Sequence, residues 1–522
     1  MSPLNETQVR SILKSLPPRI SDVVRPWSER QPDHPALVEA SGTWTYKQLD
    51  AAIPATELWL RERGVRPGDR VMIVGENCRA FVAVFLALGS MDAWPVVVNP
   101  RLSQREVDQI QNHSGARRII YTVSVSPHAA EHAKNHGAVT EEFLDLGPIG
   151  VGPLNETAVP EPVDTDVENH VAVLIYTSGT TGLPKGVMLT HRNLLFTAAG
   201  AALIRHLMPE DRLFGVLPMT HIVGLSVVLL GTLTSGATLY LTPRFDPMSA
   251  RATLEKEKIT VMLGVPSLYG QFVHYAKLRG IREFDFPSLR IISASGAPLN
   301  LSLKTSVETL FGQVLHQGYG VTETSPNISQ TRLELPRTDT SVGEPFPGVE
   351  VKLVGPDGRL VPEGEVGELW ARGPNVMKGY YRAPEETAAA LDSEGWFNTR
   401  DLARAEGRNL FIVGRTKDLI VRFGFNVYPA EIESVFNAHP EVVQSAVVGR
   451  SLEENEEIVA FVQLVPGSAL TTTQLAEYAA QQLGAYKRPT EIVLVEAMPL
   501  TSVGKVKKSE LARMAALSSQ SR

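Results

Sequence analysis

The chain has 522 residues, 43% of them hydrophobic, which is enough for about three domains with sizeable cores. Its net charge of −7 is mild and no basic run stands out, so nucleic acid is an unexpected partner. The single cysteine, Cys78, excludes an internal disulfide framework and a cysteine-based zinc site, and it fits a reducing cytosol.

Two further features concern the location of the protein. The first residues lack the basic-then-apolar order of a signal peptide, so we expect a cytoplasmic protein. Residues 213–243 carry no charged side chain, and this run is long enough to span a bilayer. However, Pro218, several glycines and a Thr-Ser-Gly-Ala turn at 234–237 interrupt it. A buried helix, a turn and a buried strand explain it better than a transmembrane helix, and no integral membrane segment is expected.

Short apolar runs alternate with helical stretches along the first half of the chain. After an amphipathic start, the pattern predicts a strand at 42–46 and a helix from Lys47 to about Gly64. Further strands are expected at 71–74, 94–98, 118–121, 171–176, 212–217, 237–241, 261–265 and 289–293, and helices at 189–207 and 223–231. This alternation is typical of doubly wound α/β sheets, and its recurrence predicts two consecutive α/β units that form two packed subdomains.

The pattern changes in the last third of the chain. Short strands with Gly and Pro turns between about 340 and 413 predict a small antiparallel, β-barrel-like element. Strands at 442–448, 459–465 and 491–495 then alternate with helices at 473–483 and 508–517, which is typical of a small α+β domain. We therefore predict an N-terminal domain over 1–415 and a C-terminal domain over 416–522.

A turn rich in glycine and hydroxyl side chains follows the apolar run 171–176. Glycines allow successive backbone N–H groups to converge, and the hydroxyls and one lysine add donors, so the turn suits an anion such as phosphate. The Gly-Lys-Ser/Thr order of the Walker loop is absent, because Pro184 precedes Lys185. The donors are Thr177, Ser178, Gly179, Thr180, Thr181, Gly182 and Lys185.

A second motif runs from His316 to Thr324. Tyr319 offers an aromatic face for a purine, and the flanking Gly318 and Gly320 let a ligand approach the backbone. Thr322 offers a hydroxyl, and the carboxylate of Glu323 is a suitable ligand for Mg²⁺.

Both motifs resemble the signature segments of the adenylate-forming superfamily, which includes acyl-CoA synthetases, 4-coumarate–CoA ligase, luciferase and peptide-synthetase adenylation domains. The resemblance covers nearly the whole chain and implies ATP as substrate. It implies stacking of Tyr319 on adenine, contact of Thr322 with the α-phosphate, and Glu323 and Thr177 as Mg²⁺ ligands. The implied ATP contacts are Thr177, Ser178, Gly179, Thr180, Thr181, Gly182, Lys185, Ser295, Gly296, Ala297, Pro298, Gln317, Gly318, Tyr319, Gly320, Val321, Thr322, Asp401, Arg415 and Lys505.

The resemblance also assigns roles near the domain junction. Asp401 and Arg415 are expected at the ribose, although this chain has Arg400 where the family usually has glycine. Lys417 is the expected hinge, and Lys505 is the expected catalytic lysine, which bridges the attacking carboxylate and the α-phosphate. Arg422, Phe423, Gly424 and Phe425 are expected at the tunnel for coenzyme A.

An acyl pocket is implied at His221, Val223, Val227, Gly296, Gly318 and Gly320. Small and apolar residues favour a monocarboxylic acid with an apolar body, and both an alkyl chain and an aryl ring fit. His221 either gates access of the thiol beside the carboxylate or is a core histidine.

The reaction expected from these parts is ATP-dependent activation of a fatty acid or aryl acid as acyl-AMP, followed by transfer to coenzyme A. The chain ends soon after Lys505, so a separate acceptor is favoured over an attached carrier domain. Three alternatives remain. They are an enzyme that loads a carrier protein, a nucleotide-binding regulator whose catalysis Arg400 has degraded, and a binding module without catalysis.

Overall fold

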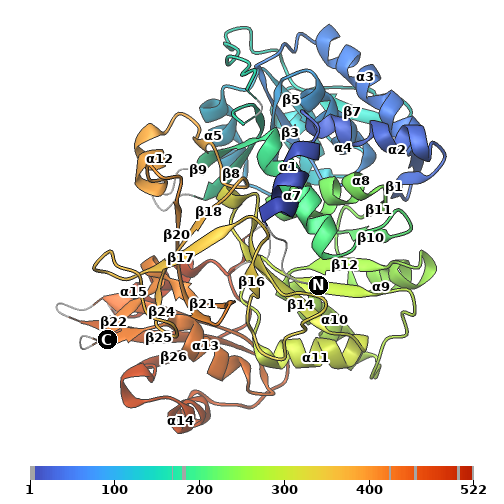
Figure 1. Cartoon of the computed structure of the whole chain (residues 1–522). Helices are drawn as coiled ribbons and strands as arrows, with labels where there is room; N and C mark the ends of the chain where they lie inside the picture. The colour runs from blue at the N-terminus through green and yellow to red at the C-terminus, as the bar shows by residue number, and fades with distance from the viewer. Residues whose placement is uncertain are drawn as a thin grey trace.

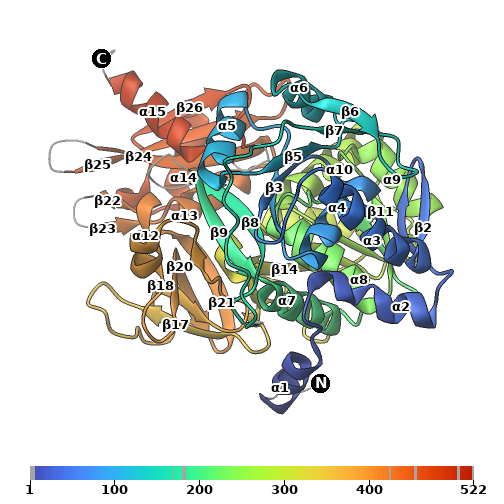
Figure 2. The ribbon, with the colours of Figure 1, turned by 90° about the horizontal axis from the view of Figure 1, so that it is seen from above.

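The structure is a computed structural model that describes residues 6–166, 168–178, 184–422, 425–451, 455–501 and 506–519. Figure 1 shows a large mixed α/β N-terminal domain, in blue to yellow, and a smaller C-terminal domain, in orange and red, at the lower left. Figure 2, seen from above, shows the C-terminal domain, in red, at one side of the N-terminal domain. The fold class expected from the sequence is therefore confirmed.

The first sheet carries the glycine-rich turn. Its core strands β3 and β4 are fully buried and pair in parallel, and helix α4 (Arg79–Ser90) is buried along almost its entire length beside them. Helices α3 (Tyr46–Glu62), α5 (Gln104–Ser114) and α6 (Pro127–Asn135) complete the layers. The strand order is β19 (Gly379–Tyr380), β9 (Pro184–Thr190), β8 (Val171–Ser178), β4 (Trp94–Val98), β3 (Arg70–Val74), β5 (Arg118–Tyr121), β7 (Pro148–Val151) and β6 (Val139–Glu142).

The second sheet carries the Tyr319 motif. Its order is β16 (Glu344–Pro345), β15 (Asn327–Gln330), β14 (Leu315–Gly320), β13 (Ile291–Ala294), β12 (Val261–Gly264), β10 (Arg212–Gly215), β11 (Thr238–Leu241), β1 (Pro35–Glu39) and β2 (Gly42–Thr45). Its flanking helices are α7 (His191–Ile204), α8 (Gly231–Ser235), α9 (Pro247–Lys256), α10 (Pro266–Leu278) and α11 (Leu301–Phe311).

The two α/β units are not consecutive along the chain, which corrects the prediction from the sequence. Strand β1 pairs in parallel with β11, with Leu37 opposite Leu239 and Val38 opposite Tyr240. The hairpin β1–β2 therefore belongs to the second sheet although it precedes the whole first sheet. Apolar periodicity identifies a strand but carries no information about the strand it pairs with. The pairing of β1 with β11 was therefore not predictable from the sequence.

Two further expectations also need correction. The predicted helix 189–207 begins only at His191, because Pro184–Thr190 forms the antiparallel strand β9. Thr190 then caps α7: its side chain accepts from the Asn193 N–H, and the Asn193 side chain accepts from the Thr190 N–H. The predicted helix 223–231 is a π-helix over Val223–Leu230, a form that is frequent at functional sites.

The remaining elements are smaller. An antiparallel sheet contains β17 (Glu350–Val354), β18 (Gly367–Arg372), β20 (Phe397–Glu406) and β21 (Asn409–Arg415). Beyond it lie β22 (Ile420–Arg422), β23 (Phe425–Val427), α13 (Pro429–Asn437), β24 (Val442–Ser451), β25 (Glu456–Leu464), α14 (Thr472–Gln482), β26 (Glu491–Val495) and α15 (Lys508–Ser519). Helices α2 (Arg25–Arg30) and α12 (Pro384–Ala390) lie at opposite edges in Figure 1, and α1 (Glu6–Ser15) lies at an edge in Figure 2.

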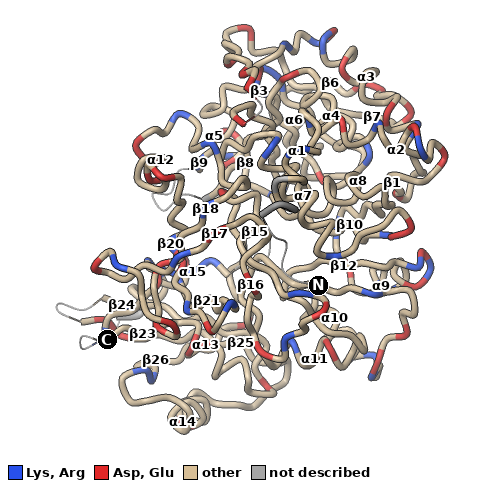
Figure 3. Tube along the Cα trace, in the orientation of Figure 1, with Lys and Arg blue, Asp and Glu red and all other residues tan. Residues whose placement is uncertain are grey.

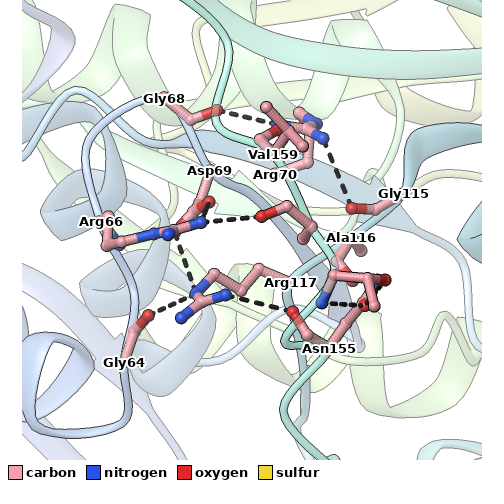
Figure 4. A network of polar contacts seen from close by, with 12 residues as sticks. Gly64, Arg66, Gly68, Asp69, Arg70, Gly115, Ala116, Arg117, Asn155 and Val159 are labelled. Atoms are coloured by element: carbon pink, nitrogen blue, oxygen red, sulfur yellow. Dashed lines mark hydrogen bonds and ion pairs between the residues drawn. The ribbon is translucent and has the colours of Figure 1, made fainter.

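A buried polar network fixes the segment that leads from β7 to β8 (Figure 4). Asp69 is fully buried and forms ion pairs with Arg66 at 3.0 Å and Arg117 at 3.2 Å. Arg70, also buried, donates its hydrogen bonds to backbone carbonyl oxygens. The three arginines together reach the carbonyls of Asn155, Ala158 and Val159. This segment is therefore held against the sheet, which fixes the approach to β8.

Charge is spread over the molecule. Figure 3 shows Lys and Arg interspersed with Asp and Glu along the trace, in keeping with the mild net charge. Among the described residues, no helix has both the length and the apolar character needed to cross a membrane.

Candidate active site

The hairpin β8–β9 presents the residues that flank the glycine-rich turn. Tyr176 lies opposite Gly186, Thr177 opposite Lys185, and Ser178 opposite Pro184. The Tyr176 hydroxyl forms a hydrogen bond of 2.8 Å with Nδ1 of His113, which fixes the hairpin against α5. The predicted phosphate contacts Gly179, Thr180, Thr181 and Gly182 lie outside the described residues.

Strand β19 extends this hairpin and brings in a residue that the sequence analysis missed. Tyr380 lies opposite Val187, and its hydroxyl donates to Oε1 of Glu323 at 2.9 Å. The Nζ of Lys185 lies 5.3 Å from the centre of the Tyr380 ring, which is a cation–π distance. Lys185 from the first sheet and Glu323 from the second motif therefore meet at one tyrosine.

Tyr319, Asp401 and Arg415 form one hydrogen-bonded group, although they come from three strands. The Tyr319 hydroxyl donates to Oδ2 of Asp401 at 2.5 Å, and Nε of Arg415 donates to Oδ1 at 2.8 Å. Asp401 and Arg415 lie opposite each other in β20 and β21. Burial raises the pKa of Tyr319, and the negative charge of Asp401 raises it further. The same negative charge raises the pKa of Arg415. The group holds both charged side chains beside one aromatic ring.

The strand pair β13–β14 brings two further predicted segments together. Ala294 lies opposite Gln317, so Ser295, Gly296, Ala297 and Pro298 leave the sheet next to the strand that carries Gly318 and Tyr319. Ser295 donates its backbone N–H to the Gly264 carbonyl at 3.1 Å. Gly296 has φ +81°, a conformation that favours glycine.

The turn after β14 requires glycine at position 320. A Cβ there would lie 1.7 Å from the carbonyl oxygen of Pro326. The same carbonyl accepts the N–H of Val321 at 3.1 Å, and Thr322 then begins a short 3₁₀ turn that ends at Thr324. Thr322 is buried and lies two residues after Gly320, so the turn groups the predicted nucleotide contacts.

Glu323 suits a divalent cation whose other ligands come from a bound substrate. Burial raises the pKa of Glu323, because few groups offset the desolvation of its charge. Among the described residues, no group of three or more His, Cys, Asp or Glu side chains could hold a metal alone. Mg²⁺ is commonly held by one or two carboxylates together with substrate phosphates, and this arrangement fits that mode. Thr177, the second predicted ligand, is half-buried on β8.

Three of the six predicted acyl residues, His221, Val223 and Val227, lie on or just before the π-helix, whereas Gly318 and Gly320 lie on β14 and Gly296 follows β13. The Leu225 N–H donates to the carbonyl of His221 at 3.0 Å, which places His221 at the first turn. His221 and Val223 are half-buried, whereas Val227 is buried in the core. A Cβ at Gly224 would lie 2.2 Å from the Pro218 carbonyl, so this end of the π-helix is tightly packed.

The junction with the C-terminal domain lies in an exposed turn. Lys417 is exposed in a 3₁₀ turn over Thr416–Asp418, and the Thr416 hydroxyl donates to Glu368 at 2.7 Å. Arg422 donates to the Arg488 carbonyl at 2.6 Å, and Phe425 packs on Tyr486 at 4.8 Å between ring centres. Phe423, Gly424 and Lys505 lie outside the described residues.

Arg400 keeps the turn that a glycine normally makes. Its φ is +59°, in the left-handed region that L side chains rarely adopt. The turn is closed by the side chains of Asn398 and Thr399, which accept the N–H groups of Arg400 and Asp401 at 2.9 and 3.0 Å. The guanidinium of Arg400 donates to the Ala389 carbonyl at 3.1 Å. This turn holds Asp401 within hydrogen-bonding distance of Tyr319 and Arg415.

Comparison with known proteins identifies the family. The model of the AMP-binding enzyme family matches residues 24–381, and that of the AMP-binding enzyme C-terminal domain matches residues 431–505. A feruloyl-CoA synthase from Amycolatopsis sp is 35% identical over 489 residues, which cover 93% of this chain and 96% of the relative. The 4-coumarate–CoA ligase 2 of Oryza sativa subsp. japonica is 33% identical, with 93% and 90% covered.

Solved structures agree with this assignment. ATP-bound MatB from Rhodopseudomonas palustris has a TM-score of 0.83 and 28% identity, with 95% of this chain and 99% of that chain covered. The o-succinylbenzoate CoA synthetase MenE from Bacillus subtilis, in complex with its acyl-adenylate, has a TM-score of 0.79 and 28% identity, with 94% and 97% covered. The chain therefore belongs to the AMP-binding enzyme family, within the adenylate-forming superfamily of acid–CoA ligases.

Proposed function

We propose that the protein activates an aryl acid of the phenylpropenoid class with ATP and Mg²⁺ and transfers it to coenzyme A. The observation that carries the proposal is the convergence of three separate segments, which carry Lys185, the pair Tyr319 and Glu323, and Asp401. Tyr380 contacts both Lys185 and Glu323, and Tyr319 donates a hydrogen bond to Asp401. Similarity to feruloyl-CoA and 4-coumarate–CoA ligases favours an aryl acid over a fatty acid.

The first half-reaction forms the acyl-adenylate. A carboxylate oxygen attacks the α-phosphorus, and the bond to pyrophosphate breaks. Tyr319 would offer its ring to the adenine, and Lys185 would neutralise phosphate charge. Asp401 would accept from the ribose hydroxyls, and Arg415 would donate to them. Glu323 and Thr177 would hold Mg²⁺, which would supply positive charge that neutralises the phosphates. Lys505 would bridge the attacking carboxylate and the α-phosphate.

The second half-reaction forms the thioester. The thiol of coenzyme A attacks the acyl carbon, and AMP leaves with the bonding electrons. We propose that the domain boundary lies between 415 and 416 and that Lys417 is the hinge about which residues 416–522 reorient. The segment Arg422–Phe425 would then border the thiol tunnel, with His221 beside the acyl carbon. The exposed position of Lys417 supports a hinge at this point.

An assay of pyrophosphate release over an acid panel tests the proposal. We expect turnover with ferulate and 4-coumarate, weaker turnover with octanoate and palmitate, and AMP as the nucleotide product. Absence of turnover with every acid would refute the proposed reaction, and preference for the alkyl acids would refute the substrate class.

The acceptor is tested in the same assay. Consumption of coenzyme A without any carrier protein is expected, and it would exclude dependence on a carrier. ATP binding without AMP formation would instead favour the regulator hypothesis that Arg400 raised.

A further inference from the structure

Tyr380 lies between two charged groups of opposite sign that both belong to the predicted ATP site. Its hydroxyl donates to the Glu323 carboxylate at 2.9 Å, and its ring faces the Lys185 ammonium at 5.3 Å. Among the described residues, no ion pair joins Lys185 directly to Glu323. Each charge therefore contacts a different part of one side chain.

The backbone around Tyr380 is fixed from both sides. The N–H of Tyr380 donates to the Thr387 hydroxyl at 2.9 Å, and Thr387 belongs to α12. Its neighbours Lys378 and Tyr381 donate their N–H groups to the β9 carbonyls of Met188 and Gly186, at 3.0 and 2.7 Å. The tyrosine is therefore part of the hairpin that carries Lys185 rather than of a free loop.

The Glu323 segment is attached to the same element. The N–H of Met377, three residues before Tyr380, donates to the Glu323 carbonyl at 2.8 Å. One short segment, 377–381, thus contacts both the β9 strand and the Glu323 turn. A side chain at its centre can set the distance between the two charges.

A tyrosine between the two charged groups keeps both of them available to a ligand. A lysine and a glutamate in direct contact would neutralise each other, and neither would then be available to a ligand. An aromatic face attracts the ammonium without occupying its hydrogen-bond donors fully, and a phenol donates one hydrogen bond while leaving the other carboxylate oxygen open. Both charges remain available to a polyphosphate that carries a divalent cation.

We propose that Tyr380 is a positioning residue that keeps Lys185 and Glu323 apart and directed at one polyphosphate–cation ligand. This inference rests on the proposed function for the identity of that ligand. The phenol acts on the carboxylate, and therefore on the cation, while the ring acts on the lysine, and therefore on the phosphates.

The adjacent Tyr381 provides a matched control. Its hydroxyl donates to Oε1 of Glu161 at 2.5 Å, and its ring packs against Trp94 and His113. It follows Tyr380 directly and has the same residue type, but among the described residues it forms no hydrogen bond or ring contact with Lys185 or Glu323.

Calorimetric titration of ATP, with and without Mg²⁺, tests the division of roles. Tyr380→Phe keeps the ring and should leave the affinity for ATP alone unchanged. It should weaken Mg²⁺-ATP binding, and raise the Mg²⁺ concentration for half-maximal pyrophosphate release, by about tenfold, as expected for loss of one hydrogen bond to a charged group. Tyr380→Leu should weaken ATP binding in both conditions, and Tyr381→Phe should change neither.

Unchanged Mg²⁺ dependence in Tyr380→Phe would overturn the proposal, as would an equal effect of Tyr381→Phe. If Tyr380→Leu fails to fold, the Phe variant, which preserves the ring volume, still decides the question. The binding readout separates this inference from the proposed function, because wild-type protein that binds Mg²⁺-ATP but turns over no acid would refute only the reaction.

Discussion

Replacement of Gly320 by alanine should disable ATP binding through the backbone. The added Cβ would lie 1.7 Å from the Pro326 carbonyl oxygen and 2.6 Å from its carbon, whereas ordinary contacts begin at 3.4 Å. These atoms belong to the backbone of the segment that pairs with β14, so the two segments must move apart by well over an ångström. Overpacking of this kind costs about 1–3 kcal/mol or more.

The displacement would also reach the nucleotide contacts. Tyr319 precedes Gly320, and its hydroxyl donates a hydrogen bond of 2.5 Å to Asp401. A shift of β14 would break this hydrogen bond. Misplacement of a positioned group by about 1 Å can lower a rate about a hundredfold. We therefore expect Gly320→Ala to lower kcat/KM for pyrophosphate release about a hundredfold, together with a lower thermal midpoint.

Gly318→Ala is the matched control for this experiment. A Cβ at position 318 meets its nearest atom, the Ser329 carbonyl oxygen, at 3.5 Å, which is an ordinary contact. We expect an unchanged thermal midpoint in this variant, and a loss of kcat/KM much smaller than that of Gly320→Ala. Equal tolerance of alanine at both positions would refute the packing argument.

Three further predictions address other residues. Lys505→Ala should reduce adenylation by about two to three orders of magnitude but leave thioester formation from preformed acyl-adenylate intact, and equal loss of both steps would make the lysine structural. Arg400→Gly should raise the free energy of unfolding by about 1 kcal/mol, because it removes a left-handed φ of +59°, whereas Arg400→Ala should give no gain in a thermal scan. Burial lowers the pKa of His316 to about 4, so its imidazole stays neutral in the folded protein while the unfolded chain takes up a proton below pH 6.5. Stability should fall by about 3 kcal/mol from this group as the pH drops from 6.5 to 4, and a thermal scan of His316→Gln that shows the same loss would contradict this assignment.

The sequence predicted the core strands and the residues beside them because both depend on local pattern. The run 171–176 is apolar and bounded by a glycine-rich turn, and it forms β8. Strand β9 was missed because its first residues belong to the glycine-rich turn motif. In addition, Leu189 fits the apolar spacing of a helix as well as that of a strand. Its identity as a strand depends on pairing with β8, which no local pattern records.

The contacts between residues of the candidate site were also not predictable from local patterns in the sequence. Tyr319, Glu323 and Asp401 were found from residue type and motif, but their mutual contacts were not. Tyr380 was missed entirely because its significance lies in two contacts with residues far away in sequence. The only local signal was a glycine followed by two tyrosines at 379–381, which alone has no specific meaning.

The place of β1 beside β11 has a consequence for how the chain is made. Residues 35–39 leave the ribosome long before residues 238–241, so the second sheet cannot close until about half of the chain has been synthesised. An expression fragment that starts after residue 45 would lack this strand and leave β11 as an unpaired edge, the kind of edge at which protein chains aggregate.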